Sequence, residues 1–105
     1  MRIVAGHLGI REGRRDALVA ASPPAVRAVW AAPGCCGFSV SADPLEADRV
    51  CIFEAWDDAE VLTAFRDGGT DAGLAAMIVG ASVGEYDVVG CGVAGGGSSA
   101  EGTQT

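Results

Sequence analysis

The chain has 105 residues, of which half are hydrophobic and a fifth are charged, and its formal net charge is −7. This length provides for one hydrophobic core, and the composition is that of a folded globular domain. All seven basic residues are arginines, and they are scattered along the chain. Because no basic stripe is present, we expect neither nucleic acid nor an acidic membrane surface as a partner.

The N-terminal residues predict a strand at once and show no apolar stretch of the kind that a signal peptide carries. No run approaches the roughly 18 apolar residues of a membrane-spanning helix, so we expect a cytoplasmic protein. The four cysteines form no CxxC pair, and the chain has one histidine, so the usual zinc-ligand spacings are missing. We expect reduced thiols, although the adjacent Cys35 and Cys36 could also form a vicinal disulfide.

The first half of the chain predicts two strands with two helical pieces between them. Apolar and β-branched residues favour strands over 3–10 and 37–42. Apolar residues at helical spacing favour a helix over 14–21 and a second helical piece over 25–31. A Ser-Pro-Pro sequence at 22–24 separates these pieces, because a residue before proline is pushed out of the α-helical region.

The second half predicts a strand, two helices and a last strand. The sequence RVCIFEAW over 49–56 is the strongest strand signal of the chain. Two aspartates follow it and precede a helix over 59–66, whose N-terminus negative charges stabilise. A short helix over 71–79 and a strand over 82–89 complete the pattern.

The element order β-α-β-β-α-β predicts an α+β fold of the ferredoxin-like type with a four-stranded antiparallel sheet. Right-handed crossovers place the first and third strands in the middle of the sheet and the helices on one face. We expect this domain to span 1–90. Residues 91–105 are rich in Gly and Ser and predict a flexible C-terminal tail.

The third strand carries apolar residues at both of its alternating positions. Val50 and Ile52 face one side of the predicted sheet, and Cys51 and Phe53 face the other. Helices cover only one of these sides, so the other needs a different cover. A second copy of the chain is the simplest one, and we therefore expect a homodimer.

Several segments together resemble one known family. They are Ile3–Leu8, the Pro-Gly-Cys segment at 33–44, the DRVCIFEAWDD segment at 48–58 and the closing segment at 81–88. From about Met1 to Val89 the chain resembles the antibiotic biosynthesis monooxygenase family. The resemblance implies a dimeric α+β barrel with a pocket in each subunit between sheet and helices. It also implies oxidation of phenolic or quinol-like compounds by O₂ without metal or flavin, and a related branch degrades haem.

The chain departs from the family pattern at three positions. Phe65 stands where many relatives carry a helical histidine, and Cys51 stands where members commonly carry asparagine. The haem-degrading branch resembles an Asn–Trp–His set. In this chain Trp56 matches the tryptophan of that set, and His7 stands at the position of its asparagine. Since the helical histidine is missing, haem chemistry is not expected.

Oxygenation without a cofactor requires a dry pocket, a proton acceptor and donors that hold an oxyanion. Imidazole, with an ordinary pKa of about 6.5, suits the acceptor, and indole offers an N–H and a stacking surface. We therefore predict His7 and Trp56 as the catalytic residues. The alternative is structural: a core or interface histidine, and a tryptophan that packs at the end of its strand.

Five further residues are predicted to bind substrate: Trp30, Phe38, Cys51, Phe65 and Tyr86. Each also has a structural alternative, since the large rings fill cores, a tyrosine on the last strand can seal a dimer edge, and a buried thiol behaves as a small hydrophobe. The acidic residues at 57–60 suit a helix N-terminus and predict no metal site.

The sequence thus predicts a cofactor-independent monooxygenase that oxidises a small phenolic, quinol or polyketide-like aromatic compound with O₂. The alternative is a non-catalytic homodimeric protein of the same fold that binds a small ligand or serves as a scaffold. A pocket with His7 or Trp56 pointing into it favours the enzyme, and side chains that fill this space favour the scaffold.

Overall fold

A computed structural model describes residues 1–68 and 72–90 of the chain. Its elements follow the predicted order and are β1 (Arg2–Ile10), α1 (Arg15–Ala21), α2 (Pro23–Trp30), β2 (Cys35–Ala42), β3 (Arg49–Trp56), α3 (Ala59–Asp67), α4 (Ala72–Ala75) and β4 (Ile78–Asp87). The tail predicted over 91–105 lies outside the described residues.

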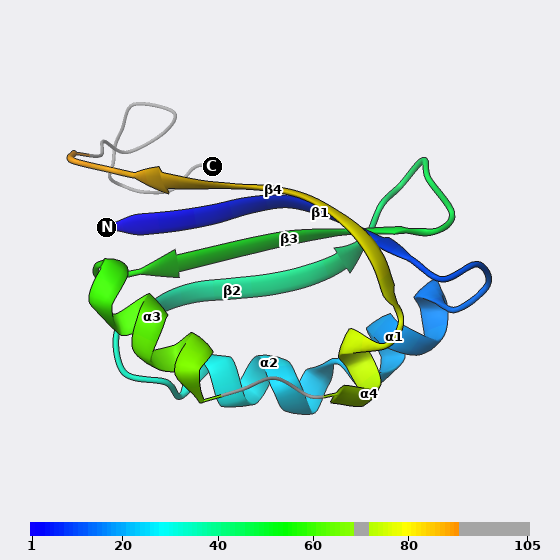
Figure 1. Cartoon of the computed structure of the whole chain (residues 1–105), viewed down its shortest axis with the longest axis horizontal. Helices are drawn as coiled ribbons and strands as arrows, with labels where there is room; N and C mark the ends of the chain where they lie inside the picture. Colours follow the sequence, from blue (N-terminus) through cyan, green and yellow to red (C-terminus); the bar gives the residue numbers. More distant parts are fainter. Residues whose placement is uncertain (69–71, 91–105) are drawn as a thin grey trace, which may run out of the picture.

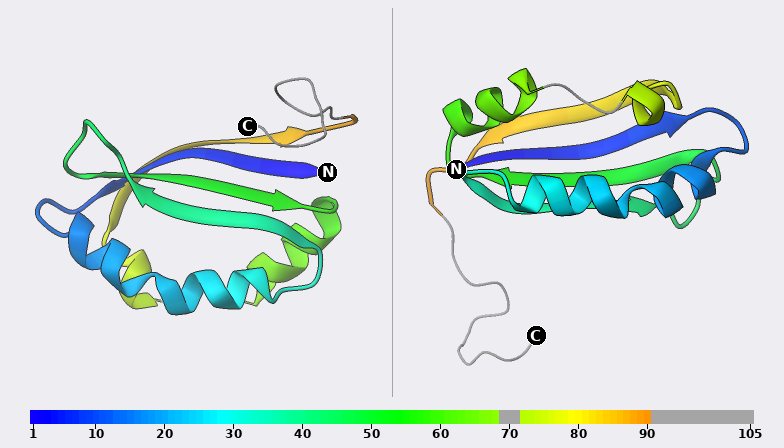
Figure 2. Two further views of the ribbon diagram at one scale, coloured as in Figure 1. Left: turned by 180° about the vertical axis from the view of Figure 1, so that it is seen from behind. Right: turned by 90° about the horizontal axis from the view of Figure 1, so that it is seen from below.

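The four strands form one antiparallel sheet in the order β2-β3-β1-β4. The α+β fold and the central position of the first and third strands are therefore confirmed. Figure 1 shows the four helices below the sheet, and the view from below in Figure 2 shows them across one of its faces. The opposite face, which we call the open face, carries no helix in the described part of the chain.

Alternate residues of each strand point toward the helices and form the core there. Two clusters of buried side chains divide it: Val4, Val29, Trp56 and Leu62 in one, and Ile10, Leu18 and Val50 in the other. Each cluster combines residues of the sheet with residues of the helices below it. These buried residues show which side of the two central strands, β1 and β3, faces the helices.

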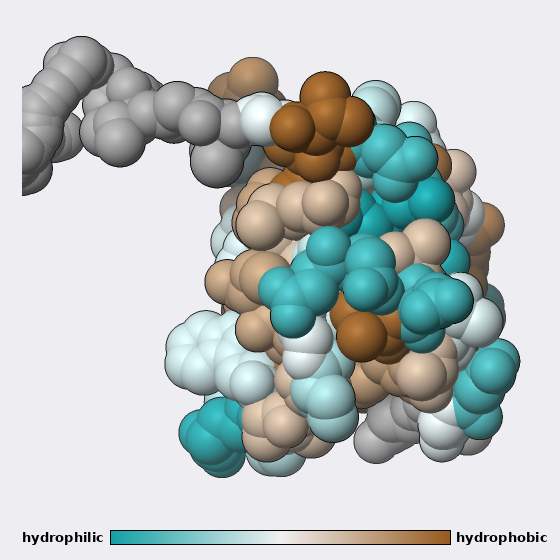
Figure 3. All heavy atoms as spheres, turned by 90° about the vertical axis from the view of Figure 1, so that its left-hand side faces the viewer, coloured by the Kyte–Doolittle hydropathy of each residue, from teal (hydrophilic) through white to brown (hydrophobic). Residues whose placement is uncertain are grey.

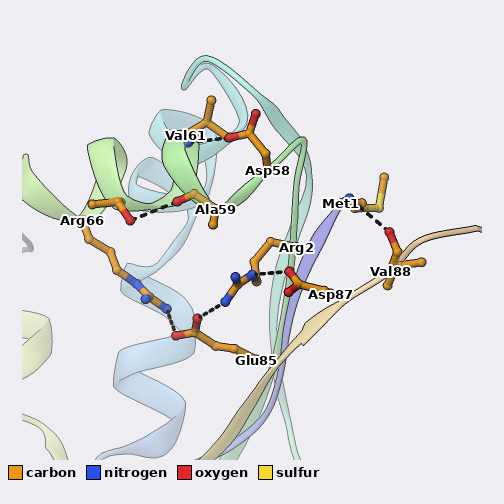
Figure 4. A network of polar contacts seen from close by, with 10 residues as sticks. Met1, Arg2, Asp58, Ala59, Val61, Arg66, Glu85, Asp87 and Val88 are labelled. Carbon is orange, nitrogen blue, oxygen red and sulfur yellow. Dashed lines mark hydrogen bonds and ion pairs between the residues drawn. The ribbon is translucent and has the colours of Figure 1, made fainter.

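The first turn of α3 shows the predicted capping. Asp58 adopts an extended conformation, and its carboxylate accepts a hydrogen bond of 3.0 Å from the backbone N–H of Val61 (Figure 4). This bond satisfies one of the free N–H groups at the helix start. It also sets the direction in which α3 leaves the end of β3.

The helix predicted over 71–79 is wrong in its extent. In the described part, α4 ends at Ala75, and Ile78 and Val79 already belong to β4. Ile78 pairs with Ile10 of β1 after a register shift. Ile78 thus finds a backbone partner in the sheet, and this tertiary pairing overrides the helical preference of the preceding Ala, Leu and Met residues.

Candidate active site on the helix-facing side of the sheet

Trp56 ends β3 and lies on the helix-facing side, where its side chain is fully buried. Its ring contacts that of Phe65 on α3, with centroids 5.1 Å apart and the planes tilted by 33°. Both rings belong to the cluster around Val4 and Leu62. The structure therefore brings two of the predicted site residues together as one aromatic wall.

Glu54 lies two residues before Trp56, so the alternation of β3 places it on the same side of the sheet. The indole Nε1–H of Trp56 donates a hydrogen bond of 3.0 Å to its Oε1. The strand neighbours of Glu54 are Val4 on β1 and Phe38 on β2, which both pack in the core cluster. A half-buried carboxylate thus stands among apolar and aromatic groups.

Glu54 is not among the site residues predicted from the sequence, although the sequence of β3 carries a signal for it. In RVCIFEAW the residues of its parity are Val50, Ile52 and Trp56, which are all apolar. A carboxylate at the buried parity of an apolar strand has to be desolvated and needs a partner. Such a residue is a candidate for function whenever its face is known.

Next to Glu54, the middle of the helix-facing side carries little side-chain cover. Gly6 of β1 lies between Ile52 of β3 and Val83 of β4. Its φ of +155° and the close backbone of Ser82 leave no room for a Cβ atom. Val83 is 37% exposed although it faces the helices, so solvent reaches the sheet from the side of β4.

A network of charges closes the end of the sheet near α3 (Figure 4). Glu85 of β4 accepts from Arg66 of α3 at 2.8 Å and from Arg2 of β1 at 3.0 Å. Arg2 also lies 2.9 Å from a carboxylate oxygen of Asp87. The hydrogen bond from Arg66 is the main cause that lowers the pKa of Glu85. Viewed end on in Figure 3, hydrophilic residues spread over this end, and hydrophobic residues gather at the top, where β4 ends.

Trp30 and Phe38 meet at a second place, the outer edge of β2. They line a shallow groove of about 450 Å³ together with Gly37 and the vicinal cysteines. Trp30 is 61% exposed, so the structural alternative considered for it, a ring that fills the core, is wrong. Its indole N–H donates to the backbone carbonyl of Phe38 at 2.8 Å, because this carbonyl points outward from the edge strand.

Both vicinal cysteines are free thiols, as the sequence predicts. Cys36 donates to a carboxylate oxygen of Asp57 at 3.1 Å, and this hydrogen bond raises the pKa of the thiol. A raised pKa keeps the thiol protonated near neutral pH and makes it a poor nucleophile. Cys36 is therefore not an activated thiol.

His7, Cys51 and Tyr86 lie on the open face, opposite the helices. They have the other parity from the core residues of their strands, and His7 stands directly between Cys51 and Ser82. Burial is the main cause that raises the pKa of the Cys51 thiol, which contacts Asp43 at 3.6 Å. The structure therefore separates His7 from Trp56: within one chain, the two predicted catalytic residues do not line one site.

The donor set does not fit a haem held by a histidine ligand. The helix position that the resemblance assigns to such a ligand carries Phe65, whose ring packs on Trp56. His7 is the sole histidine of the chain and belongs to the open face. Within residues 1–68 and 72–90, no three His, Cys, Asp or Glu side chains converge as metal ligands.

None of the helices within residues 1–68 and 72–90 combines the length and the apolar composition that crossing a membrane requires.

Comparison with solved structures finds the same fold in several proteins. A protein from Chloroflexus aurantiacus J-10-fl that bears the name of antibiotic biosynthesis monooxygenase has 27% sequence identity and a TM-score of 0.65, over 90% of this chain and 98% of its own. A protein of the same name from Deinococcus radiodurans has 17% identity and a TM-score of 0.73, over 91% and 100%. The haem-degrading MhuD of Mycobacterium tuberculosis, solved with two haems in its active site, has 20% identity and a TM-score of 0.65, over 89% and 100%.

Among curated proteins, none matches the chain in sequence. The sequence profile described as antibiotic biosynthesis monooxygenase matches residues 1–70, which include β1 to β3 and the whole aromatic wall. Profile and fold agree with the resemblance seen in the sequence, and the chain belongs to the antibiotic biosynthesis monooxygenase family.

Proposed function

We propose that this domain is an oxygenase that oxidises a small electron-rich aromatic compound, such as a phenol, a quinol or a polyketide-like ring system, with O₂. The observation that supports it most is the pair of Glu54 and Trp56 beside Phe65. An aromatic wall with one polar group aimed along it suits a flat ring that carries a hydroxyl or keto group. Membership of a family named for monooxygenases supports the same reaction class.

The proposed reaction requires no redox-active group in the protein, because the substrate supplies the electrons. Removal of a proton from a phenol or from the CH₂ group of its keto tautomer leaves an anion that can give an electron to O₂. Oxidation of such a CH₂ group to a carbonyl consumes one O₂ and releases one water. The protein then has to hold the ring, keep water out and accept a proton. Neither a metal nor a flavin is part of the proposal.

We further propose that the domain works as a homodimer in the cytoplasm. Phe53 and Tyr86 are 42% and 56% exposed on the open face, and a second sheet could cover both. Cys35, Cys36 and Cys51 are free thiols, as expected in a reducing compartment.

A second candidate function is a non-catalytic protein that binds a small ligand or serves as a scaffold. One observation favours it: the Trp56 side chain is fully buried and its N–H is occupied by Glu54. In that case the aromatic wall is a packed core. Fold and family alone do not separate the two functions.

Oxygen consumption separates them. Wild-type protein is supplied with a panel of quinols and anthrones, with and without a chelator, and O₂ uptake is followed against the autoxidation rate of each compound. The oxygenase raises O₂ uptake above this background with at least one compound and is insensitive to the chelator. Uptake at the background rate for the whole panel favours the non-catalytic protein.

A further inference from the structure

We infer that Glu54 is the catalytic proton acceptor of the proposed oxygenase, in place of the open-face histidine; the inference rests on the proposed function. Three observations support it. Glu54 shares its side of the sheet with Trp56 and Phe65. It is half-buried between strand neighbours that pack in the core. Solvent reaches the same side of the sheet at Val83 of β4.

The hydrogen bond from Trp56 gives the carboxylate a fixed orientation. Nε1 of the buried indole holds Oε1 at 3.0 Å, and burial of Trp56 prevents the ring from turning away. Oε2 accepts no hydrogen bond from any described residue, so it is available to a substrate hydroxyl or an acidic C–H group. A positioned acceptor of this kind is what general base catalysis requires.

Two other carboxylates near α3 already have structural partners. Glu85 is held by Arg66 and Arg2, and Asp58 caps the helix. Among the ion pairs of the described residues, none includes Glu54. Among the described residues, its carboxylate is therefore not neutralised by an ion pair.

The reaction step balances with O₂ as the oxidant. Glu54 takes one proton from the CH₂ group of the keto tautomer of the substrate, and the resulting carbanion transfers one electron to O₂. The substrate radical and superoxide then combine, which forms the C–O bond of a peroxide. Protonated Glu54 returns its proton to the distal peroxide oxygen. This regenerates the carboxylate. The second hydrogen of the former CH₂ group then leaves as a proton, the O–O bond breaks, and this proton leaves with the distal hydroxide as water, which gives the carbonyl product. In total the substrate loses four electrons, which reduce one O₂: one of its oxygen atoms becomes the carbonyl oxygen, and the other leaves as water.

The kinetic test compares three variants of the full chain. Glu54→Gln keeps an acceptor for the indole N–H and cannot take a proton, so kcat should fall by about 10²–10⁴ while KM changes by less than about threefold. Glu60→Gln, an exposed residue of α3, is the matched control and should act as wild type. With Glu54→Ala, added formate should restore part of the rate, and it should not affect wild type. A Glu54→Gln variant with wild-type turnover overturns the inference, as does Glu54→Ala that formate does not rescue.

A binding test needs no turnover and separates failure of the inference from failure of the proposed function. The probes are 2-naphthol and its methyl ether, and binding is followed by quenching of tryptophan fluorescence. Wild type should prefer the naphthol by about tenfold, since a hydrogen bond to a charged acceptor is a strong one. Glu54→Leu, with its melting temperature checked, should bind both probes equally. Equal binding by wild type overturns the role of Glu54 even if oxygen is consumed. A preference that Glu54→Leu abolishes supports this role even if no quinol is oxidised.

Discussion

Glu54 and Trp56 can be placed on one face from the sequence alone, because two residues of one strand with the same parity share a face. Whether His7 and Trp56 share a face cannot be determined from the sequence alone, because they lie on different strands. Both parities of β1 are apolar, with Ile3 and Ala5 on one and Val4 and Leu8 on the other, so the pattern does not tell which side meets the helices. The register of β1 with β3 decides it and places His7 on the open face.

At the scale of single residues, Trp56 provides a prediction that distinguishes its ring from its N–H group. Trp56→Phe retains an aromatic ring against Phe65 and removes the donor that orients Glu54, so kcat should fall by about tenfold, and the loss of stability should be smaller than on removal of the whole ring. Trp56→Ala also leaves a cavity and should destabilise the fold by about 3–5 kcal/mol. Oxygen uptake and urea unfolding measure the two effects. Equal turnover of wild type and Trp56→Phe would contradict the orienting role.

At the scale of elements, local signals predict where helices begin better than how they connect. The aspartate cap of α3 follows from the sequence, because a cap is a contact within four residues. The ion pair that ties α3 to β4 joins Arg66 to Glu85 across nineteen positions, and spacing along the chain cannot show it. The end of α4 is missed for the same reason, since β1 determines where β4 begins.

This ion pair predicts an acid-sensitive part of the stability. The pKa of Glu85 is lowered below its ordinary value of 4.5 by Arg66 and Arg2, so the carboxylate form is favoured in the folded state. The contribution is therefore present above about pH 4.5 and is lost as the pH falls through the lowered pKa of the folded protein. Because the side chain is 37% exposed, the pair should contribute less than about 1 kcal/mol.

Urea unfolding of wild type and Glu85→Gln measures this contribution. The variant should be less stable at about pH 7, and the difference should shrink as the pH falls through the lowered pKa of Glu85, because the carboxylate is then protonated in both states. Glu12→Gln in the turn after β1 is the control and should show no such difference, since Glu12 is exposed and has no ion pair among the described residues. A stability difference that does not change with pH would assign the role of Glu85 to packing.

At the scale of the whole molecule, the order of the sheet follows from the element order, because short right-handed connections leave few alternatives. What covers the open face does not follow from one chain. Most of its side chains are small, among them Ala5, Ser39 and Ser82, and small side chains let a second sheet approach closely. Phe53 and Tyr86 then supply the apolar area that an isolated domain would leave in water.

If two copies of the chain pack through their open faces, one charged residue placed on this face should prevent the dimer from forming. Phe53→Glu places a carboxylate in the centre of the interface, where desolvation without a partner is costly, so the variant should sediment as a monomer. Leu45→Glu is the matched control: Leu45 is 91% exposed in the turn between β2 and β3, and its substitution should leave the dimer intact. Sedimentation velocity at micromolar concentration should give wild type and Leu45→Glu twice the mass of Phe53→Glu. Melting temperatures of the two variants show whether Phe53→Glu remains folded, and a wild type that sediments as a monomer contradicts the dimer. Because Glu54 faces the helices and Phe53 faces away from them, a folded Phe53→Glu monomer that still binds 2-naphthol would place the substrate within one subunit.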